Sequence, residues 1–192
     1  MIESLYEPFR KWTQTGTLWV YSDPHFADEE MVQLRKNYIG DSEQIAKINA
    51  QVGRKDTIIF LGDIGDEECV RKIRGYKVLI MGNHDKGATK YAGIFDEVYE
   101  GPLFIMEKLL LSHEPISLPF AFNIHGHDHS NWDAGSKHHL NVCAEHIDYT
   151  PVNLTRLLKR GLLSKVESIH RMTIDNATTR KRAREVKHGK RA

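Results

Sequence analysis

The sequence predicts an α/β fold, and three observations support this prediction. The first half of the chain holds three short apolar runs that read as buried strands, and segments with helical spacing lie between them. Such alternation is typical of βαβ units, whose strands are parallel. The second half consists mainly of closely spaced short apolar runs, which favour further strands. A length of 192 residues is most simply one domain, which can bury a sizeable core without disulfides.

The elements of the first half follow from the periodicity of their apolar residues. Strands are predicted at residues 17–21, 57–61 and 77–81. Helices are predicted at residues 29–38, 42–52 and 67–73. Ser42 is a candidate N-cap of the second helix. Asp66 precedes the third helix, where it either caps that helix or orients a metal ligand.

The second half is predicted to contain short strands joined by tight turns, which is typical of antiparallel pairing. The expected strands are residues 98–99, 103–106, 109–112, 121–124 and 139–142. Residues 152–158 fit either a last strand or the start of a helix. Beyond about residue 181 the chain is almost entirely basic and small residues. We therefore expect one domain over residues 1–180 and a disordered tail over residues 181–192.

The composition is that of a globular protein whose charge is unevenly distributed. The formal net charge is +1, but residues 151–192 hold 12 basic and 3 acidic residues, which leaves a net charge of −8 for residues 1–150. The basic segment is either a solvated tail or a contact for nucleic acid, because clustered lysines and arginines are attracted by phosphates.

The chain is expected to be a cytoplasmic protein that does not enter a membrane. Its two cysteines, Cys69 and Cys143, form no CxxC pair, which favours a reducing compartment. The N-terminal residues include acids and lack the apolar core of a secretory signal. No run approaches the roughly 18 apolar residues of a membrane helix.

Polar residues suited to metal binding follow each strand of the first half. Asp23 and His25 follow the first strand, Asp63 follows the second, and Asn83 and His84 follow the third. Because parallel strands place their carboxyl ends along one edge of the sheet, these side chains are expected to lie close together.

The second half adds more imidazoles. His113 closes one strand, and His127 and His129 are spaced so that an extended chain would place both on one face. A nitrogen and oxygen donor set without cysteine suits Mn, Fe, Zn, Co or Ni better than Ca or Mg. Such a set is too large for one tetrahedral site, and it suits two metals about 3.5–4 Å apart with a bridging carboxylate. The candidate ligands are Asp23, His25, Asp63, Asn83, His113, His127 and His129.

Each candidate also has an ordinary structural interpretation. Asp63 could be a turn residue or a helix cap, and Asn83 could occupy a left-handed turn beside Gly82. A single histidine such as His25 or His113 is more often a packing or surface residue. The occurrence of donors at three strand ends together with the paired histidines favours the metal site.

At these residues the chain resembles the calcineurin-like metallophosphoesterases, in particular the small single-domain bacterial and phage members. Five motifs of that family occur in its order: D-x-H at residues 23–25, G-D-x-x-D at 62–66, G-N-H-[DE] at 82–85, a lone histidine at 113, and G-H-x-H at 126–129. Together they are a far more specific signal than any one of them. Pro24 is a departure at a variable position, where we expect little effect on metal binding.

The resemblance implies a four-layer αββα sandwich with two mixed sheets, and it implies roles for the site residues. His84 would face the leaving group without binding metal, and the additional His125 would stand beside the ligands. Mn²⁺ is the expected metal, with Fe, Zn, Ni and Co as alternatives. The first metal would be held by Asp23, His25, Asp63 and His129, and the second by Asp63 as the bridge with Asn83, His113 and His127.

The expected function is therefore hydrolysis of phosphate esters. Two metals lower the pKa of a bridging water, and the resulting hydroxide attacks phosphorus in line with the leaving oxygen. His84, next to Asp85 or another acid, is a candidate general acid. The absence of an obvious cap domain favours phosphodiesters, including nucleotides and nucleic acid.

Two other functions remain open at this stage. One is a silent metal-binding scaffold for a protein partner, although such members of the family typically lose the equivalent of His84. The other is a nuclease recruited to nucleic acid by the basic tail. The natural substrate and the oligomeric state have no signal in the sequence.

Overall fold

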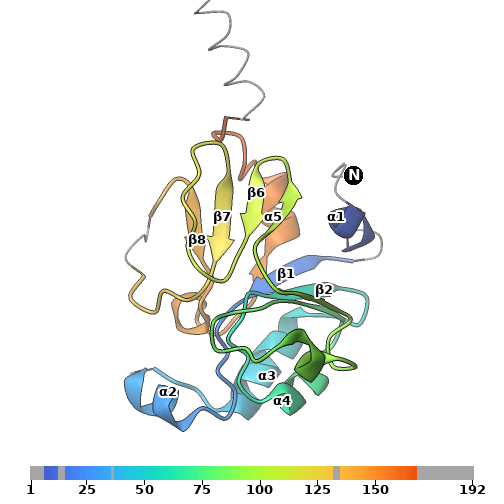
Figure 1. Cartoon of the computed structure of the whole chain (residues 1–192), viewed down its shortest axis with the longest axis vertical. Helices are drawn as coiled ribbons and strands as arrows, with labels where there is room; N and C mark the ends of the chain where they lie inside the picture. The colour runs from blue at the N-terminus through green and yellow to red at the C-terminus, as the bar shows by residue number, and fades with distance from the viewer. Residues whose placement is uncertain (1–6, 13–15, 36, 132–134, 168–192) are drawn as a thin grey trace, which may run out of the picture.

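Two stacked β-sheets and the helices around them form the fold (Figure 1). The computed structural model describes residues 7–12, 16–35, 37–131 and 135–167. The predicted tail over residues 181–192 lies outside the described residues. Within the described part, no helix combines the length and the apolar character needed to cross a membrane.

The first sheet holds the strands of the alternating half. Neighbouring strands from β4 to β1 are parallel, and β9 pairs antiparallel with β1 at the edge. Both faces of β1 and β2 are covered, which explains why their sequences are continuously apolar. The spatial order is β4 (Glu97–Tyr99), β3 (Tyr76–Ile80), β2 (Thr57–Phe60), β1 (Leu18–Tyr21) and β9 (Val152–Asn153).

The second sheet is also mixed, which corrects the prediction of antiparallel strands joined by tight turns. Only β5 and β6 are antiparallel, and β6, β7 and β8 are parallel. In addition, β4 joins the first sheet rather than the second. Parallel neighbours need a crossover, which the segments 112–121 and 126–138 provide; the residues that the structure describes in these segments form no helix. The order is β5 (Leu103–Met106), β6 (Leu109–Leu111), β7 (Phe122–His125) and β8 (His139–Asn141).

Two apolar cores lie on the two faces of the first sheet. Trp19 and Tyr21 of β1 belong to the core shared with α3 (Asp41–Gln51) and α4 (Glu67–Arg71), which cover the face turned away from the second sheet (Figure 1). Leu18 and Val20 alternate with them and belong to the core between the sheets. The prediction of two mixed sheets flanked by helices is therefore confirmed.

Short helices close the core between the sheets. Neither α1 (Glu7–Trp12) nor the helical turn η2 (Ala144–Ile147) was expected from the sequence. Residues 152–158, which fit either a strand or the start of a helix, contain both. The strand β9 runs directly into α5 (Leu154–Lys159), whose first turn is capped by Asn153.

Helix boundaries differ from the predictions at the caps. The helix α2 (Glu29–Leu34) ends earlier than expected, because Arg35 adopts an extended backbone. Ser42 lies inside α3, whose N-cap is Gly40 without a side-chain bond, so its predicted capping role is wrong. Asp66 does cap α4, since its carboxylate accepts a hydrogen bond from the backbone of Glu68. The remaining helical turn, η1 (Ala88–Tyr91), follows the third strand of the first sheet.

Candidate metal centre

The carboxyl ends of strands from both sheets bring two groups of donors together. In each group, one donor atom from every side chain lies within 4.8 Å of the others. The donors of the first sheet follow β1, β2 and β3, and those of the second sheet follow β6 and β7. The first group is Asp23, His25 and His129, and the second is Asp63, His113 and His127.

The two carboxylate oxygens of Asp23 have different surroundings. Its Oδ2 accepts hydrogen bonds from Ser22 Oγ at 2.5 Å, from the backbone N–H of His127 at 2.9 Å and from Cys143 Sγ at 3.3 Å. Its Oδ1 is buried and has no hydrogen-bond partner. Only Oδ1 is therefore left to bind a cation.

The imidazoles of the first group face this free oxygen. His25 Nε2 lies 3.9 Å and His129 Nε2 3.6 Å from Asp23 Oδ1. His25 Nε2 is likewise buried without a hydrogen-bond partner, while its Nδ1 lies 3.0 Å from Asp28. Burying such polar atoms unpaired costs free energy, which a cation bound between them would offset. The residues of this group therefore fit a metal ion.

One atom of Asp63 faces both groups. Its Oδ1 accepts a hydrogen bond from the backbone N–H of His84 at 3.0 Å. Its Oδ2 lies 3.7 Å from His25 Nε2 of the first group and 3.3 Å from His113 Nε2 of the second. This is the placement that a bridging carboxylate requires.

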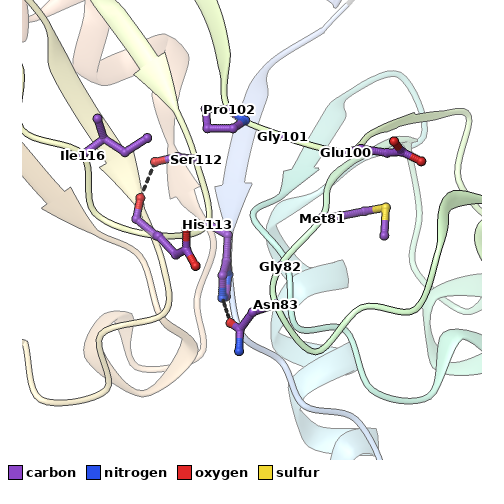
Figure 2. A pocket seen from close by; sticks show the side chains of 10 residues that line it. Met81, Gly82, Asn83, Glu100, Gly101, Pro102, Ser112, His113 and Ile116 are labelled. Carbon is purple, nitrogen blue, oxygen red and sulfur yellow. Dashed lines mark hydrogen bonds between the residues drawn. The ribbon is translucent and has the colours of Figure 1, made fainter.

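Asn83 lies against the second group. Its Oδ1 is 2.8 Å from His113 Nε2 and 3.0 Å from His127 Nδ1, and the bond to His113 is drawn in Figure 2. His113 Nδ1 lies 2.7 Å from the Leu61 carbonyl, which fixes the orientation of the ring. The structure thus gathers all seven predicted ligands at one place.

The electrostatic potential of the site favours positive charge. Burial alone would lower the pKa of His113, but the carboxylate of Asp63, together with that of Asp23, raises it to about 9. Burial also opposes ionisation of Asp63, yet its contact with His113 holds its pKa below the usual value. A potential that holds a proton on a buried imidazole also attracts a divalent cation.

His127 and His129 differ from the expectation of a shared face. The segment after β7 is not extended, since His127 has a φ of 64°, and the two rings enter different groups. Asp23 (φ 54°), His25 (φ 45°) and Asp63 (φ 52°) are also in the left-handed region. Such backbone strain costs roughly 1 kcal/mol or more per residue and tends to occur at functional sites.

Gly126 and Gly82 allow the loops to approach one another. A Cβ on Gly126 would overlap Ser22 Oγ and Asp23 Oδ2. A Cβ on Gly82 would overlap Asp63 Oδ1. Glycine is required at both positions because side-chain oxygens of the site occupy that space.

His84 is exposed and belongs to neither group, although its ring centroid lies 5.9 Å from that of His25. Asp85, the suggested acidic partner of His84, forms its hydrogen bonds with other residues. The Asp85 carboxylate accepts hydrogen bonds from the backbone of Asp63, Ile64 and Gly82 and, at 2.6 Å, from the hydroxyl of Tyr91. It therefore fixes the two loops that carry the ligands.

Several residues around the centre carry no sequence signal. Glu145 Oε1 lies 2.5 Å from His129 Nδ1, and Arg35 is buried beside both residues. Burial would raise the pKa of Glu145, but His129 and Arg35 hold it below the usual value. Burial and then Asp23 raise the pKa of the Cys143 thiol. None of these residues belongs to a motif, and only the fold brings them to the site.

The other histidines near the site hold the backbone. His125 is buried, and its Nδ1 lies 2.8 Å from the carbonyl oxygen of Gly126. His146 Nε2 lies 3.0 Å from the carbonyl oxygen of Asp128. Both contacts support the loop that carries His127 and His129. His125 therefore stands beside the ligands, as predicted.

A cavity of about 220 Å³ opens beside the second group (Figure 2). Asn83 and His113 form part of its wall, and the segment after β4 and the start of the β6–β7 connection form the rest. The lining is mixed: it includes the imidazole of His113 and the residues Glu100 and Glu114, and it holds no lysine or arginine.

Comparison with known proteins places the chain in a family. The model of the calcineurin-like phosphoesterases matches residues 16–190. A search of curated proteins finds no match. AQ665, a protein of unknown function from Aquifex aeolicus, is 24% identical, with a TM-score of 0.64 over 74% of this chain and 98% of that one. Nuclease MPE of Pseudomonas putida is 22% identical, with a TM-score of 0.44 over 58% and 61%.

The AQ665 structure supports the fold, and the family match covers all five motifs and both donor groups. A metal-dependent phosphoesterase site is consistent with the buried, unpartnered donor atoms described above. The chain belongs to the calcineurin-like phosphoesterase family.

Proposed function

We propose that the protein is a phosphoesterase with a binuclear metal centre and a preference for phosphodiesters. The observation that carries the proposal is the position of Asp63 Oδ2, which faces donors of both groups. Asp23, His25 and His129 would complete one metal site with Asp63. Asn83, His113 and His127 would complete the other, and Mn²⁺ is the first metal to test.

Bound there, two divalent ions would lower the pKa of a shared water and offset negative charge on the phosphate. The protein itself orients the donors. Ser22, Cys143 and the backbone of His127 hold Asp23 so that Oδ1 faces inward. The exposed His84 stands beside the first group, where its imidazole can give a proton to the leaving oxygen.

The preference for diesters follows from the cavity beside the second group. A phosphomonoester carries about −1.5 to −2 charges at pH 7, whereas a diester carries about −1. Glu100 and Glu114 line the cavity without a lysine or arginine in its wall, so negative charge beyond that offset by His113 and the bound metals is disfavoured there. The cavity would take the uncharged ester group of a diester.

The direct test is hydrolysis of a chromogenic diester and its matching monoester by metal-stripped protein resupplied with Mn²⁺. We expect turnover that depends on Mn²⁺ and is faster with the diester. Two bound metals without turnover of either compound, with Mn²⁺, Ni²⁺, Co²⁺ or Zn²⁺, would favour the scaffold alternative. Faster hydrolysis of the monoester would contradict the preference.

Action on nucleic acid is a second candidate, favoured by the charge of residues 151–192. If it is correct, deletion of residues 181–192 weakens binding of DNA or RNA steeply at low salt and leaves turnover of a small diester unchanged. Unchanged nucleic-acid binding would exclude recruitment by the tail.

A further inference from the structure

We infer that Glu145 is a positioning residue for the metal centre and that Arg35 holds it in place. The inference rests on the proposed binuclear centre. It concerns two largely buried charged side chains, which expose 13% and 4% of their surface.

The contact between Glu145 and His129 selects one tautomer of the imidazole. Glu145 Oε1 lies 2.5 Å from His129 Nδ1, and a carboxylate has no proton to donate, so the proton of this bond belongs to Nδ1. In the neutral imidazole the lone pair is then on Nε2, which faces Asp23 Oδ1 at 3.6 Å. A histidine that binds metal through Nε2 typically donates its other N–H in this way.

Arg35 offers a competing contact that is too weak to reverse this assignment. Its Nη2 lies 3.3 Å from the same His129 Nδ1, and as a donor it would require an unprotonated nitrogen. The contact with Glu145 is 0.8 Å shorter and involves an ionised acceptor, which makes the stronger hydrogen bond. Nδ1 therefore donates to Glu145.

Arg35 instead contacts the carboxylate of Glu145 and the backbone of the loop that carries Asp23. Its Nη1 forms an ion pair with Glu145 Oε2 at 3.5 Å, without a hydrogen bond, and its Nη2 donates to the backbone carbonyl of Asp23 at 3.1 Å. The backbone is anchored at the same place, because the N–H of Ala144 donates to the Ser22 carbonyl at 3.0 Å. His129 thus contacts Oε1 of Glu145, and Arg35 contacts Oε2. The backbone next to Glu145 is also bonded to the backbone next to Asp23.

A third metal between these residues is disfavoured. His129, Cys143 and Glu145 do lie close enough for three donors to share an ion. However, the guanidinium of Arg35 already stands against Glu145 and would repel another cation. The positive charge of Arg35 offsets the charge of the Glu145 carboxylate. His129 therefore remains available as a ligand of the first group.

Mn²⁺ binding to the metal-stripped full-length protein, measured by calorimetry, tests the inference. The Glu145→Ala variant should bind Mn²⁺ about 10–100-fold more weakly at one of two sites, which is typical for loss of such a partner. Glu145→Gln should lose less, because its amide oxygen still accepts the bond. Glu43 is exposed and lies outside the site. Glu43→Ala therefore removes the same charge and should bind Mn²⁺ as tightly as the wild type.

A second readout does not depend on metal. Nitrogen NMR of the metal-free protein should show His129 with its proton on Nδ1 in the wild type, and a shift toward the other tautomer in Glu145→Ala. An unchanged tautomer, or unchanged affinity at both sites, would overturn the inference. Wild-type protein that binds fewer than two ions would instead contradict the proposed function, and the tautomer would still decide the role of Glu145.

Loss of Glu145 alone leaves the buried Arg35 guanidinium without its carboxylate partner, which can destabilise the fold by itself. The double variant Arg35→Met with Glu145→Met removes both charges and should melt at a higher temperature than Glu145→Ala, although it also loses the hydrogen bond from Arg35 to the Asp23 carbonyl. It should still bind one Mn²⁺ weakly. Recovery of full affinity would show that the unpaired arginine, and not the loss of positioning, caused the defect.

Discussion

In Asp23 and in Asp63, the two carboxylate oxygens have different roles. Asp23 uses one oxygen to hold three donors of the protein and leaves the other free, and Asp63 turns one oxygen toward both groups. The identities of these ligands could be predicted because they sit in motifs at strand ends. Glu145 and Arg35 could not, because they come from a cap and a helical turn that only the tertiary structure brings to His129.

Replacement of Asp63 tests the shared ligand. Asp63→Ala should lose both Mn²⁺ ions and nearly all turnover, because one carboxylate serves both sites. Elemental analysis after dialysis measures the metal content. Asp66→Asn is the matched control, since Asp66 caps α4 and belongs to neither group, and it should keep two ions. Retention of one tightly bound ion in Asp63→Ala would contradict a bridging role.

Replacement of His84 separates metal binding from proton transfer. His84→Ala should bind metal normally and slow hydrolysis by about 10²–10⁴-fold with poor leaving groups. Good leaving groups need less protonation and should be slowed less. A series of aryl diesters with graded leaving-group pKa values measures this dependence. Equal slowing across the series would assign His84 to stabilising the phosphate.

At the scale of elements, the first sheet was more predictable than the second. The continuous apolar runs of β1, β2 and β3 are short enough for strands and end in turn residues, so their type and their parallel arrangement could be predicted. The pairing of β6, β7 and β8 could not, because short apolar runs look alike in parallel and antiparallel sheets. The crossovers between them carry His113, His127 and His129, so the unpredicted connections hold part of the site.

The close approach of the β7–β8 connection to β1 predicts a specific defect. Gly126→Ala should destabilise the fold by about 1–3 kcal/mol, a typical cost of overpacking, and weaken metal binding, because its Cβ overlaps the Asp23 side chain. Denaturant unfolding and Mn²⁺ titration measure the two effects. Gly40→Ala, which has open space around it, should leave metal affinity unchanged and carry only the small cost of an alanine at the N-cap of α3. A Gly126→Ala protein with normal metal affinity would show that the loop can move aside.

For the whole molecule, α1 is joined to the first sheet through the partly buried carboxylate of Glu97. Glu97 of β4 accepts bonds from Lys11 Nζ at 2.7 Å, Trp12 Nε1 at 3.2 Å, and the hydroxyls of Tyr76 at 2.7 Å and Tyr99 at 2.6 Å. Burial opposes its ionisation, but Lys11 and the other donors lower its pKa below the usual value. No sequence motif predicts this network, because Lys11 and Trp12 lie 86 and 85 residues from Glu97 in the chain.

This network makes stability depend on pH. A carboxyl with a lowered folded-state pKa stabilises the protein above its unfolded pKa, about 4.3, and the contribution is lost as pH falls through the folded value. The wild type should therefore exceed Glu97→Gln in free energy of unfolding at pH 7, and the difference should shrink below about pH 4. Urea unfolding at several pH values measures it. A difference independent of pH would mean that the charge of Glu97 contributes nothing.

The proposed centre consists of two metals that share Asp63. Mn²⁺ titration of the metal-stripped protein, followed by electron paramagnetic resonance, tests this most directly. We predict two ions per chain and, at saturation, the signal of a spin-coupled pair, because ions joined by one carboxylate lie about 3.5–4 Å apart. A single ion, or two ions with independent signals, would contradict the account.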